Sequence, residues 1–162
     1  MPVTQVDTDR DNLTLTITAE FAAPVERVWG IYADPRQLER VWGPPSHPAT
    51  FVDFDLTPGG LVTYFMTSPE GEKYCGYWRI AEVDAPTGLA FADGFADADF
   101  NPITDLPESQ NAYGFAVGGA GTVATYRSAF PSAEALEKVL EMGMVEGATE
   151  AINQIDDFLA AG

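Results

Sequence analysis

Residues 132–162, SAEALEKVLEMGMVEGATEAINQIDDFLAAG, decide the fold. Apolar residues recur there at three- and four-residue steps, which predicts one face of a helix about 30 residues long. They are Leu136, Leu140, Met144, Gly147, Ala151, Ile155 and Phe158. Ser132 is a suitable N-cap, and acidic residues take most of the opposite face. The sequence therefore predicts one long, solvated C-terminal helix that lies on an apolar surface.

The middle of this helix is unusual because it contains Gly143 and Gly147 on either side of Met144. Each glycine costs about 1 kcal/mol relative to alanine in a helix interior. Small residues on a buried face indicate that another element approaches closely, or that the packing leaves a gap.

The rest of the chain predicts the sheet that this helix covers. From Leu13 to Phe21, apolar residues alternate with polar ones, as in a half-buried strand. Further strands are predicted at residues 49–56, 61–67, 73–83, 89–95, 113–117 and 122–130. Two short helices begin at Pro24 and Pro35. Short turns favour antiparallel neighbours, so we predict an α+β fold: a curved antiparallel sheet of about six to seven strands gripping the helix.

The domain organisation and partners follow from composition. Hydrophobic residues make up 46% of 162 residues, which suits a single domain at 12–162 after a polar, flexible N-terminus at 1–11. A net charge of −17 argues against nucleic acid and anionic membrane surfaces as partners. The chain has one cysteine and neither a long apolar run nor a signal-like start. We therefore expect no internal disulfide, no membrane insertion and a cytoplasmic protein.

Several motifs together resemble a known family. They are FxAPxxxVW in Phe21–Trp29, DPxxLxxxWGPP in Asp34–Pro45, PGG at Pro58–Gly60, MTSPEG from Met66, the start FPSAEALE at Phe130, and MGMVEG…QIDDFLA in the last helix. This pattern is similar to the START-like (SRPBCC, Bet v 1-like) superfamily, in its bacterial stand-alone branch named after the activator of the heat-shock-protein-90 ATPase. The resemblance covers about residues 12–160 and implies a helix-grip fold.

The resemblance implies several functions, because the superfamily includes lipid carriers, hormone and polyketide binders, cyclases and oxygenase subunits. Members of the branch often carry an arginine just before the PGG-like turn, where this chain has Thr57. An anionic contact made by that arginine is therefore not expected here.

The leading candidate site is a cavity between the sheet and the C-terminal helix. An apolar space with a few polar tips, such as tyrosine hydroxyls, is typical of small-molecule sites. Its expected lining is Trp42, Tyr64, Met66, Tyr77, Tyr113, Phe115, Met144, Gly147 and Ala151. The alternative is an ordinary core filled by the same side chains. Both remain open at this point, although the START-like architecture often leaves a void.

An acidic segment resembles a calcium-binding loop in its spacing. Asp97, Asp99, Asn101, Asp105 and Glu108 have the spacing of a calcium loop, but Pro102 stands where that loop needs glycine, so we predict an acidic surface loop.

Three further candidate sites are better explained without a function. Ser46-His47 reads as an exposed turn and not a nucleophile–base pair, and the single histidine argues against a multi-histidine metal site. Cys75 is interpreted as a small residue within a strand. The spacing of Glu82 and Asp84 is expected by chance in a chain with so many acidic residues, so we do not predict an acid–base pair there. We expect no catalytic residues, metal or cofactor.

Three functions remain. The first is binding of a small hydrophobic or amphipathic molecule by a carrier, sensor or sequestering protein. The second, implied by the family name, is assistance to a heat-shock-protein-90-type chaperone in stress response. The third is a cyclase or hydrolase in the same cavity, ranked last because no titratable group inside the pocket stands out. An exposed sheet edge also allows a homodimer.

Overall fold

A computed structural model of the chain describes residues 2–161. The strands are β1 (Val3–Asp9), β2 (Thr14–Phe21), β3 (Ala49–Phe54), β4 (Leu61–Thr67), β5 (Lys73–Asp84), β6 (Gly88–Ala96), β7 (Ser109–Gly118) and β8 (Gly121–Ala129). The helices are α1 (Val25–Ala33), α2 (Pro35–Leu38), α3 (Ala133–Glu141) and α4 (Met144–Ala160). None of the helices described is long and apolar enough to cross a membrane.

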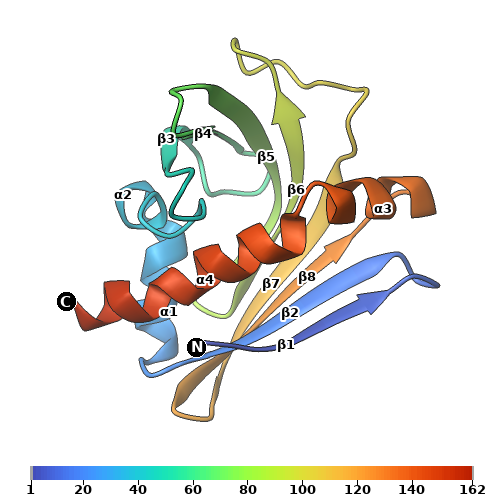
Figure 1. Ribbon diagram of the computed structural model, residues 1–162. Helices are drawn as coiled ribbons and strands as arrows, with labels where there is room; N and C mark the ends of the chain where they lie inside the picture. The colour runs from blue at the N-terminus through green and yellow to red at the C-terminus, as the bar shows by residue number, and fades with distance from the viewer. Residues whose placement is uncertain (1, 162) are drawn as a thin grey trace.

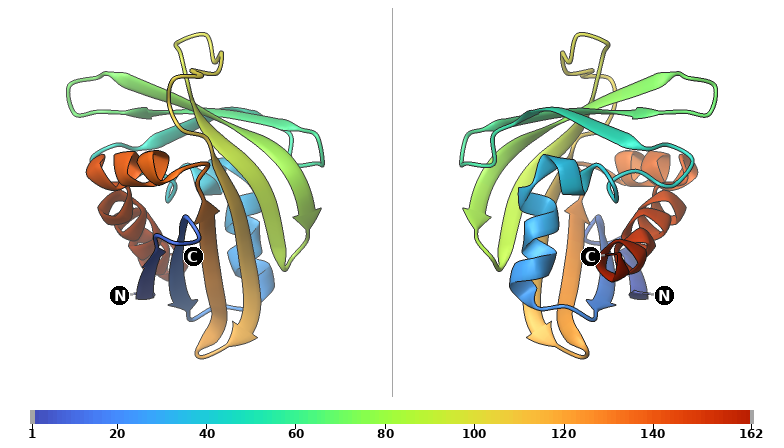
Figure 2. Two further views of the ribbon diagram at one scale, coloured as in Figure 1. Left: turned by 90° about the vertical axis from the view of Figure 1, so that its right-hand side faces the viewer. Right: turned by 90° about the vertical axis from the view of Figure 1, so that its left-hand side faces the viewer.

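All the strands belong to one antiparallel sheet in the order β1-β2-β8-β7-β6-β5-β4-β3. The sheet curves strongly without closing, and α3 and α4 lie across its concave side (Figures 1 and 2). The two short helices α1 and α2 connect β2 to β3, as expected from Pro24 and Pro35. This architecture is the helix-grip fold that the sequence predicted, with eight strands within residues 2–161 instead of six to seven.

The additional strand is β1, so the expectation of a flexible N-terminus over residues 1–11 is wrong for the part described. Val6 pairs with Ile17 in β2, and the Val3 backbone N–H donates to Asn153 Oδ1 at 3.1 Å. From Thr4 to Asp9 every side chain of β1 is exposed. An edge strand held by backbone hydrogen bonds needs no buried face, so its residues show no apolar alternation. Position 1 lies outside the described residues.

The C-terminal helix is two helices, which corrects the prediction of a single one. α3 begins after Ser132, whose hydroxyl accepts from the Ala135 N–H at 3.1 Å, as expected. It ends at Glu141 with Met142 as its C-cap, and Gly143 takes φ +81° before α4 begins. Glycine adopts this left-handed conformation without the steric cost that a Cβ imposes, which is why it commonly follows a helix end. Position 162 lies outside the described residues.

The buried side chains form two clusters. The larger one joins α1, α2 and the C-terminal half of α4 to the sheet, and includes Phe21, Trp78 and Ile155. The smaller one joins α3 to the sheet through Leu15 and Leu136. The helices therefore pack firmly at both ends of the concave face, on either side of the joint at Gly143.

Candidate ligand-binding site

A cavity of about 480 Å³ lies between the concave face of the sheet and the joint of α3 and α4. Its apolar wall includes Leu15 and Ile17 from β2, Trp42 after α2, Met66 from β4, Phe95 from β6, and Met144, Ala148, Ala151 and Ile152 from α4. Residues of both hydrophobic clusters reach it. The volume falls in the range of small-molecule sites, about 300–1,000 Å³.

The space exists because α4 presents small residues to it. A Cβ atom added at Gly147 would meet no other atom within 4 Å, so this glycine leaves a gap and does not permit a close approach. Gly143 and Ala151 also line the cavity. The sequence left two explanations open for the glycines, a close approach of another element or a gap in the packing, and at Gly147 the structure shows a gap.

The cavity meets solvent near the joint between α3 and α4. Tyr74 and Met142 both line it, and they are 52% and 53% exposed. The His47 ring lies beside them, with its centroid 6.0 Å from that of Tyr74. An opening made of one methionine and two rings can change shape through side-chain rotation alone.

The charged group on the cavity wall, among the described residues, is the carboxyl group of Asp93 in β6. Its Oδ1 accepts a hydrogen bond from the Tyr64 hydroxyl at 2.8 Å. Tyr64 comes from β4 and reaches over β5 at Gly76, where an added Cβ would lie only 2.5 Å from the tyrosine ring. A glycine at position 76 is therefore needed for this contact between two strands that are not neighbours.

Burial changes the ionisation of Asp93. Desolvation raises the pKa of its carboxyl group to about 7, the nearby Glu108 charge adds to the rise, and the Tyr64 hydrogen bond opposes it. No lysine or arginine is among the residues lining the cavity in the described chain. The carboxyl group is thus held in an apolar space without a cationic partner.

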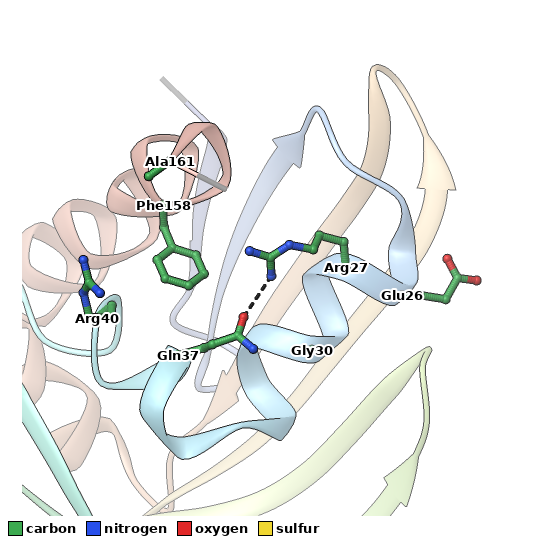
Figure 3. A pocket seen from close by; sticks show the side chains of 7 residues that line it. All are labelled: Glu26, Arg27, Gly30, Gln37, Arg40, Phe158 and Ala161. Carbon is green, nitrogen blue, oxygen red and sulfur yellow. Dashed lines mark hydrogen bonds between the residues drawn. The ribbon is translucent and has the colours of Figure 1, made fainter.

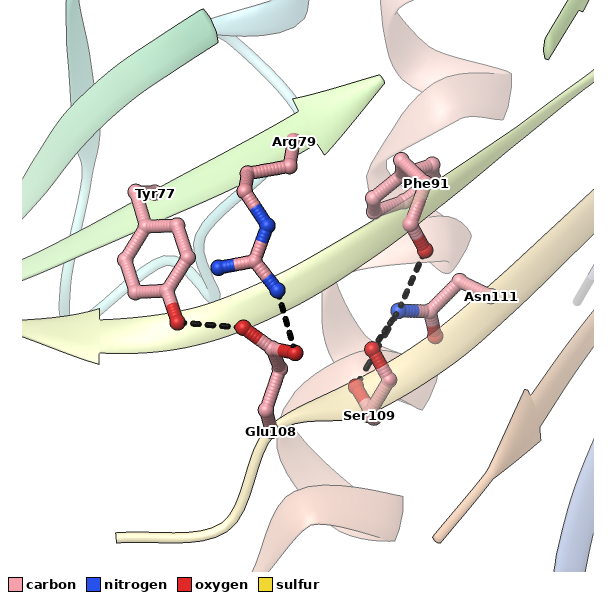
Figure 4. Close-up of polar contacts among 6 residues, drawn as sticks. All are labelled: Tyr77, Arg79, Phe91, Glu108, Ser109 and Asn111. Carbon is pink, nitrogen blue, oxygen red and sulfur yellow. Dashed lines mark hydrogen bonds and ion pairs between the residues drawn. The ribbon is translucent and has the colours of Figure 1, made fainter. Parts of the chain in front are cut away.

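A second polar group adjoins Asp93 on the cavity wall. Ser109 pairs directly with Asp93 across β6 and β7. Its hydroxyl accepts from Asn111 Nδ2 at 3.0 Å (Figure 4). Asn111 Oδ1 accepts from the Ser128 hydroxyl at 2.6 Å. These hydrogen bonds link the three residues into a polar stripe on an otherwise apolar wall.

Three further polar groups on the cavity wall are tyrosine hydroxyls. The Tyr32 and Tyr126 hydroxyls bond to each other at 2.7 Å, and desolvation raises the pKa of both phenols. The Tyr113 hydroxyl makes no hydrogen bond to any residue that the structure describes, although Tyr113 lines the cavity and its ring is only partly exposed. This hydroxyl remains available to a molecule inside the cavity.

Most of the residues expected from the sequence do line the cavity. They are Trp42, Tyr64, Met66, Tyr113, Met144, Gly147 and Ala151. Phe115 does not line it, because the ring packs between α1 and the sheet, 5.3 Å from Tyr32 by ring centroid.

Tyr77 also does not line the cavity, contrary to the sequence prediction. Side chains alternate along β5, so Trp78 faces the helices and Tyr77 the convex side. There its hydroxyl donates to Glu108, which also pairs with Arg79 at 2.6 Å (Figure 4). Its ring lies over Gly94, which buries Tyr77 without bringing it into the cavity.

The weaker sequence candidates have structural roles. Asp97 Oδ1 accepts from the backbone N–H groups of Asp99 and Asn101, which organises the acidic loop. Desolvation raises the pKa of the Cys75 thiol, and the nearby Lys73 only opposes that rise, so a reactive thiolate is disfavoured. His47 differs from expectation, because it lines the cavity opening and is only partly exposed.

Sequence reasoning missed Asp93, although a signal was present. Leu89, Phe91, Asp93 and Phe95 alternate through β6 and share one face. Phe91 is 1% exposed and stacks on Trp78. The two-residue period of side chains along the strand therefore places the Asp93 carboxyl group on the same, core-facing side as Phe91. The surplus of acids in the chain masked this position.

A second, more open concavity lies on the surface between α1, α2 and the end of α4 (Figure 3). The guanidinium groups of Arg27 and Arg40 lie 5.2 and 5.8 Å from the centre of the Phe158 ring. Arg27 also donates to Gln37 at 2.9 Å. These contacts show that the two arginines pack around the end of α4.

Solved structures similar to this one come from several bacteria. Protein Ms6760 from Mycobacterium smegmatis is 67% identical, with 99% of each chain covered and a TM-score of 0.92. A protein from Arthrobacter aurescens is 45% identical over 99% of this chain and 93% of its own, with a TM-score of 0.94. DynU16, from the dynemicin biosynthetic locus, shares the fold alone, at 17% identity, 88% of this chain, 47% of its own and a TM-score of 0.62.

No curated protein matches the chain. Residues 22–160 match the family described as Activator of Hsp90 ATPase homolog 1-like protein. That match spans most of the helix-grip domain, from the end of β2 to the last turn of α4. The chain therefore belongs to the Activator of Hsp90 ATPase homolog 1-like family, within the START-like (SRPBCC, Bet v 1-like) fold.

Proposed function

We propose that the protein binds a small amphipathic molecule in the cavity between the sheet and α4, as a carrier, sensor or sequestering protein. The observation that carries this proposal is an apolar space of about 480 Å³ with neighbouring polar side chains, Asp93, Ser109 and Asn111, on its wall. Asp93 and Tyr113 each offer hydrogen-bonding capacity there that no described residue uses. A core built only for packing would bury such groups with their partners.

The shape of the cavity indicates how a ligand would lie. Its polar end would contact Asp93, Tyr113 and the stripe of Ser109, Asn111 and Ser128. Its apolar body would contact Met144, Gly147 and Ala151 on α4. Entry would pass Tyr74 and Met142, both half exposed at the opening.

The first test is native mass spectrometry of freshly purified protein, compared with its denatured mass. We expect a co-purifying mass of roughly a few hundred daltons, the range that sites of this volume hold. A clean unliganded mass, together with no thermal shift across a panel of lipids and aromatic compounds, would contradict the proposal.

A matched pair of variants sharpens this test. Gly147→Leu places a side chain in the cavity, and Gly30→Leu makes the same change in α1, where an added Cβ likewise meets nothing within 4 Å (Figure 3). Ligand occupancy should fall at least tenfold in Gly147→Leu and stay unchanged in Gly30→Leu. Equal occupancy in both variants would place the ligand elsewhere.

Asp93 also supports catalysis as a second candidate function. A carboxyl group with a pKa of about 7 inside a cavity is the kind of titratable group that a cyclase or hydrolase requires, and it can both donate and accept a proton near neutrality. In the mass-spectrometric experiment, conversion of the ligand to a new mass that stops in Asp93→Asn would indicate an enzyme and not a carrier.

A further inference from the structure

The chemistry of the cavity also restricts the charge of its ligand. The described residues that line it include one carboxyl group, Asp93, and no lysine or arginine. A fatty acid or phosphate group would therefore lie beside a like charge with no cation to receive it. Neutral and cationic head groups are the classes that remain.

Asp93 has unused capacity to accept hydrogen bonds. Within the described chain, only the Tyr64 hydroxyl bonds to this carboxyl group, through Oδ1. An ionised carboxylate has about four lone-pair positions, so most of them stay open. Folding has already removed the group from bulk water, so the cost of its desolvation is not incurred again when a ligand binds.

Aromatic rings lie around the same carboxyl group. Trp42 and Tyr64 both line the cavity, with ring centroids 5.8 Å apart, and Tyr64 donates to Asp93. Tyr113 also lines it, and desolvation is the main cause that raises the pKa of its phenol, with the nearby charges of Tyr32 and Asp93 adding to the rise. Rings grouped around a carboxylate are a recognised arrangement for organic ammonium ions, which ring faces and the anion both attract.

We propose that the cavity binds an amphipathic organic amine, whose ammonium group pairs with Asp93 among Trp42, Tyr64 and Tyr113 while its apolar body lies against α4. This inference rests on the proposed function, because it names the class of ligand for the same cavity. The net charge of −17 adds a long-range attraction for cations and increases their rate of encounter.

Isothermal titration calorimetry with matched ligands tests the proposal. Phenylbutyl, naphthylmethyl and dodecyl compounds are each used as the amine, the alcohol and the carboxylate, below any micelle concentration. At pH 8 the amine of at least one series should bind at least tenfold more tightly than its alcohol and its carboxylate. The inference would be overturned if, in every series, the amine failed to bind at least tenfold more tightly than both its alcohol and its carboxylate.

Two variants separate the cavity from the acidic surface. Asp93→Asn keeps an oxygen that accepts from Tyr64, and it should abolish the preference for the amine. Asp84→Asn makes the same change at an exposed position outside the cavity and should retain the preference. An amine preference that survives in Asp93→Asn would mean general attraction to the acidic surface and would overturn the proposal.

The wild-type protein provides a test that needs no substitution. Lowering the pH from 8 to 6 protonates Asp93, so amine affinity should fall roughly tenfold while alcohol affinity stays constant. The other titratable groups near Asp93 are Tyr64, Tyr113 and Glu108, and His47 lines the cavity opening. The pH effect must therefore disappear in Asp93→Asn, and its persistence there would contradict the assignment to Asp93.

The results also distinguish this inference from the proposed function. A co-purified ligand that carries no amine, together with no amine preference in the series, overturns the inference alone. Absence of any co-purified ligand, together with no binding in any series, overturns both.

Discussion

At the scale of single residues, Asp93 is the group that most clearly opposes the stability of the empty protein. Its side chain is only partly exposed, lies on the cavity wall with aromatic rings, and among the described residues accepts one hydrogen bond, from Tyr64. Such a group weakens the folded state whenever it is ionised, because the unfolded chain would surround it with water. Its position is understandable if the group serves binding or chemistry in the cavity.

The effect on stability depends on pH in a defined direction. The pKa of Asp93 is about 7 in the folded protein, against an ordinary value of 3.8. Between these values the unfolded state has released the proton and the folded state has kept it, so this residue makes stability fall as pH rises from about 4 to about 7. Asp93→Asn should therefore raise the free energy of unfolding at pH 8 by about 2 kcal/mol, and by progressively less towards pH 4.

Urea unfolding at a series of pH values measures this difference. Asp84→Asn is the control, since the Asp84 side chain is exposed and should change little at any pH. A loss of stability at pH 8 in Asp93→Asn would show that the ionised carboxylate is stabilised by its surroundings, contrary to the burial described here.

At the scale of elements, the joint between α3 and α4 shapes the cavity. Gly143 takes φ +81° between the helices, and Gly147 lies one turn later on the cavity wall. The two glycines therefore have different reasons to be there. One supplies a backbone conformation, and the other leaves space.

Alanine substitutions should separate these two roles by the sign of their effect. Gly143→Ala should lower the free energy of unfolding by about 1–2 kcal/mol, because alanine is strained at positive φ. Gly147→Ala should raise it by about 1 kcal/mol through helix propensity, since its Cβ meets no other atom within 4 Å. Urea unfolding of both variants measures the pair. A neutral Gly143→Ala would mean that α3 and α4 can join into one continuous helix.

At the scale of the whole molecule, the charge of −17 is distributed over a small domain. The salt bridges recorded among the described residues all lie at least partly in solvent, where ion pairs contribute little. Most acidic side chains therefore repel one another, and the compact state brings them closer together than the unfolded chain does.

Screening this repulsion should stabilise the fold. Raising NaCl from 0.05 to 0.5 M should increase the free energy of unfolding by about 1 kcal/mol, because the Debye length becomes shorter than the spacing of most surface charges. Urea is the denaturant, because guanidinium would itself screen the charges. KCl at the same ionic strength should act alike, and a decrease in stability with both salts would contradict the prediction.

Local chemistry determined much of this protein. Alternation from Leu13 to Phe21 predicted a strand, and Ser132 predicted a helix start, from the residues alone. The glycines at 143 and 147 predicted a close approach or a gap in the packing of the last helix. These features depend on neighbours a few positions away, which the sequence contains. The family was predicted from the resemblance of several sequence motifs to those of its members.

Only the tertiary structure decided the rest. Strand β1 is held by backbone hydrogen bonds that leave no hydrophobic pattern, and Tyr77 and Tyr64 differ only in which face of the sheet they occupy. The pairing of Asp93 with Tyr64 joins residues 29 positions apart across an intervening strand. Burial, and with it the chemistry of the cavity, is a property of three-dimensional packing that no short stretch of sequence contains.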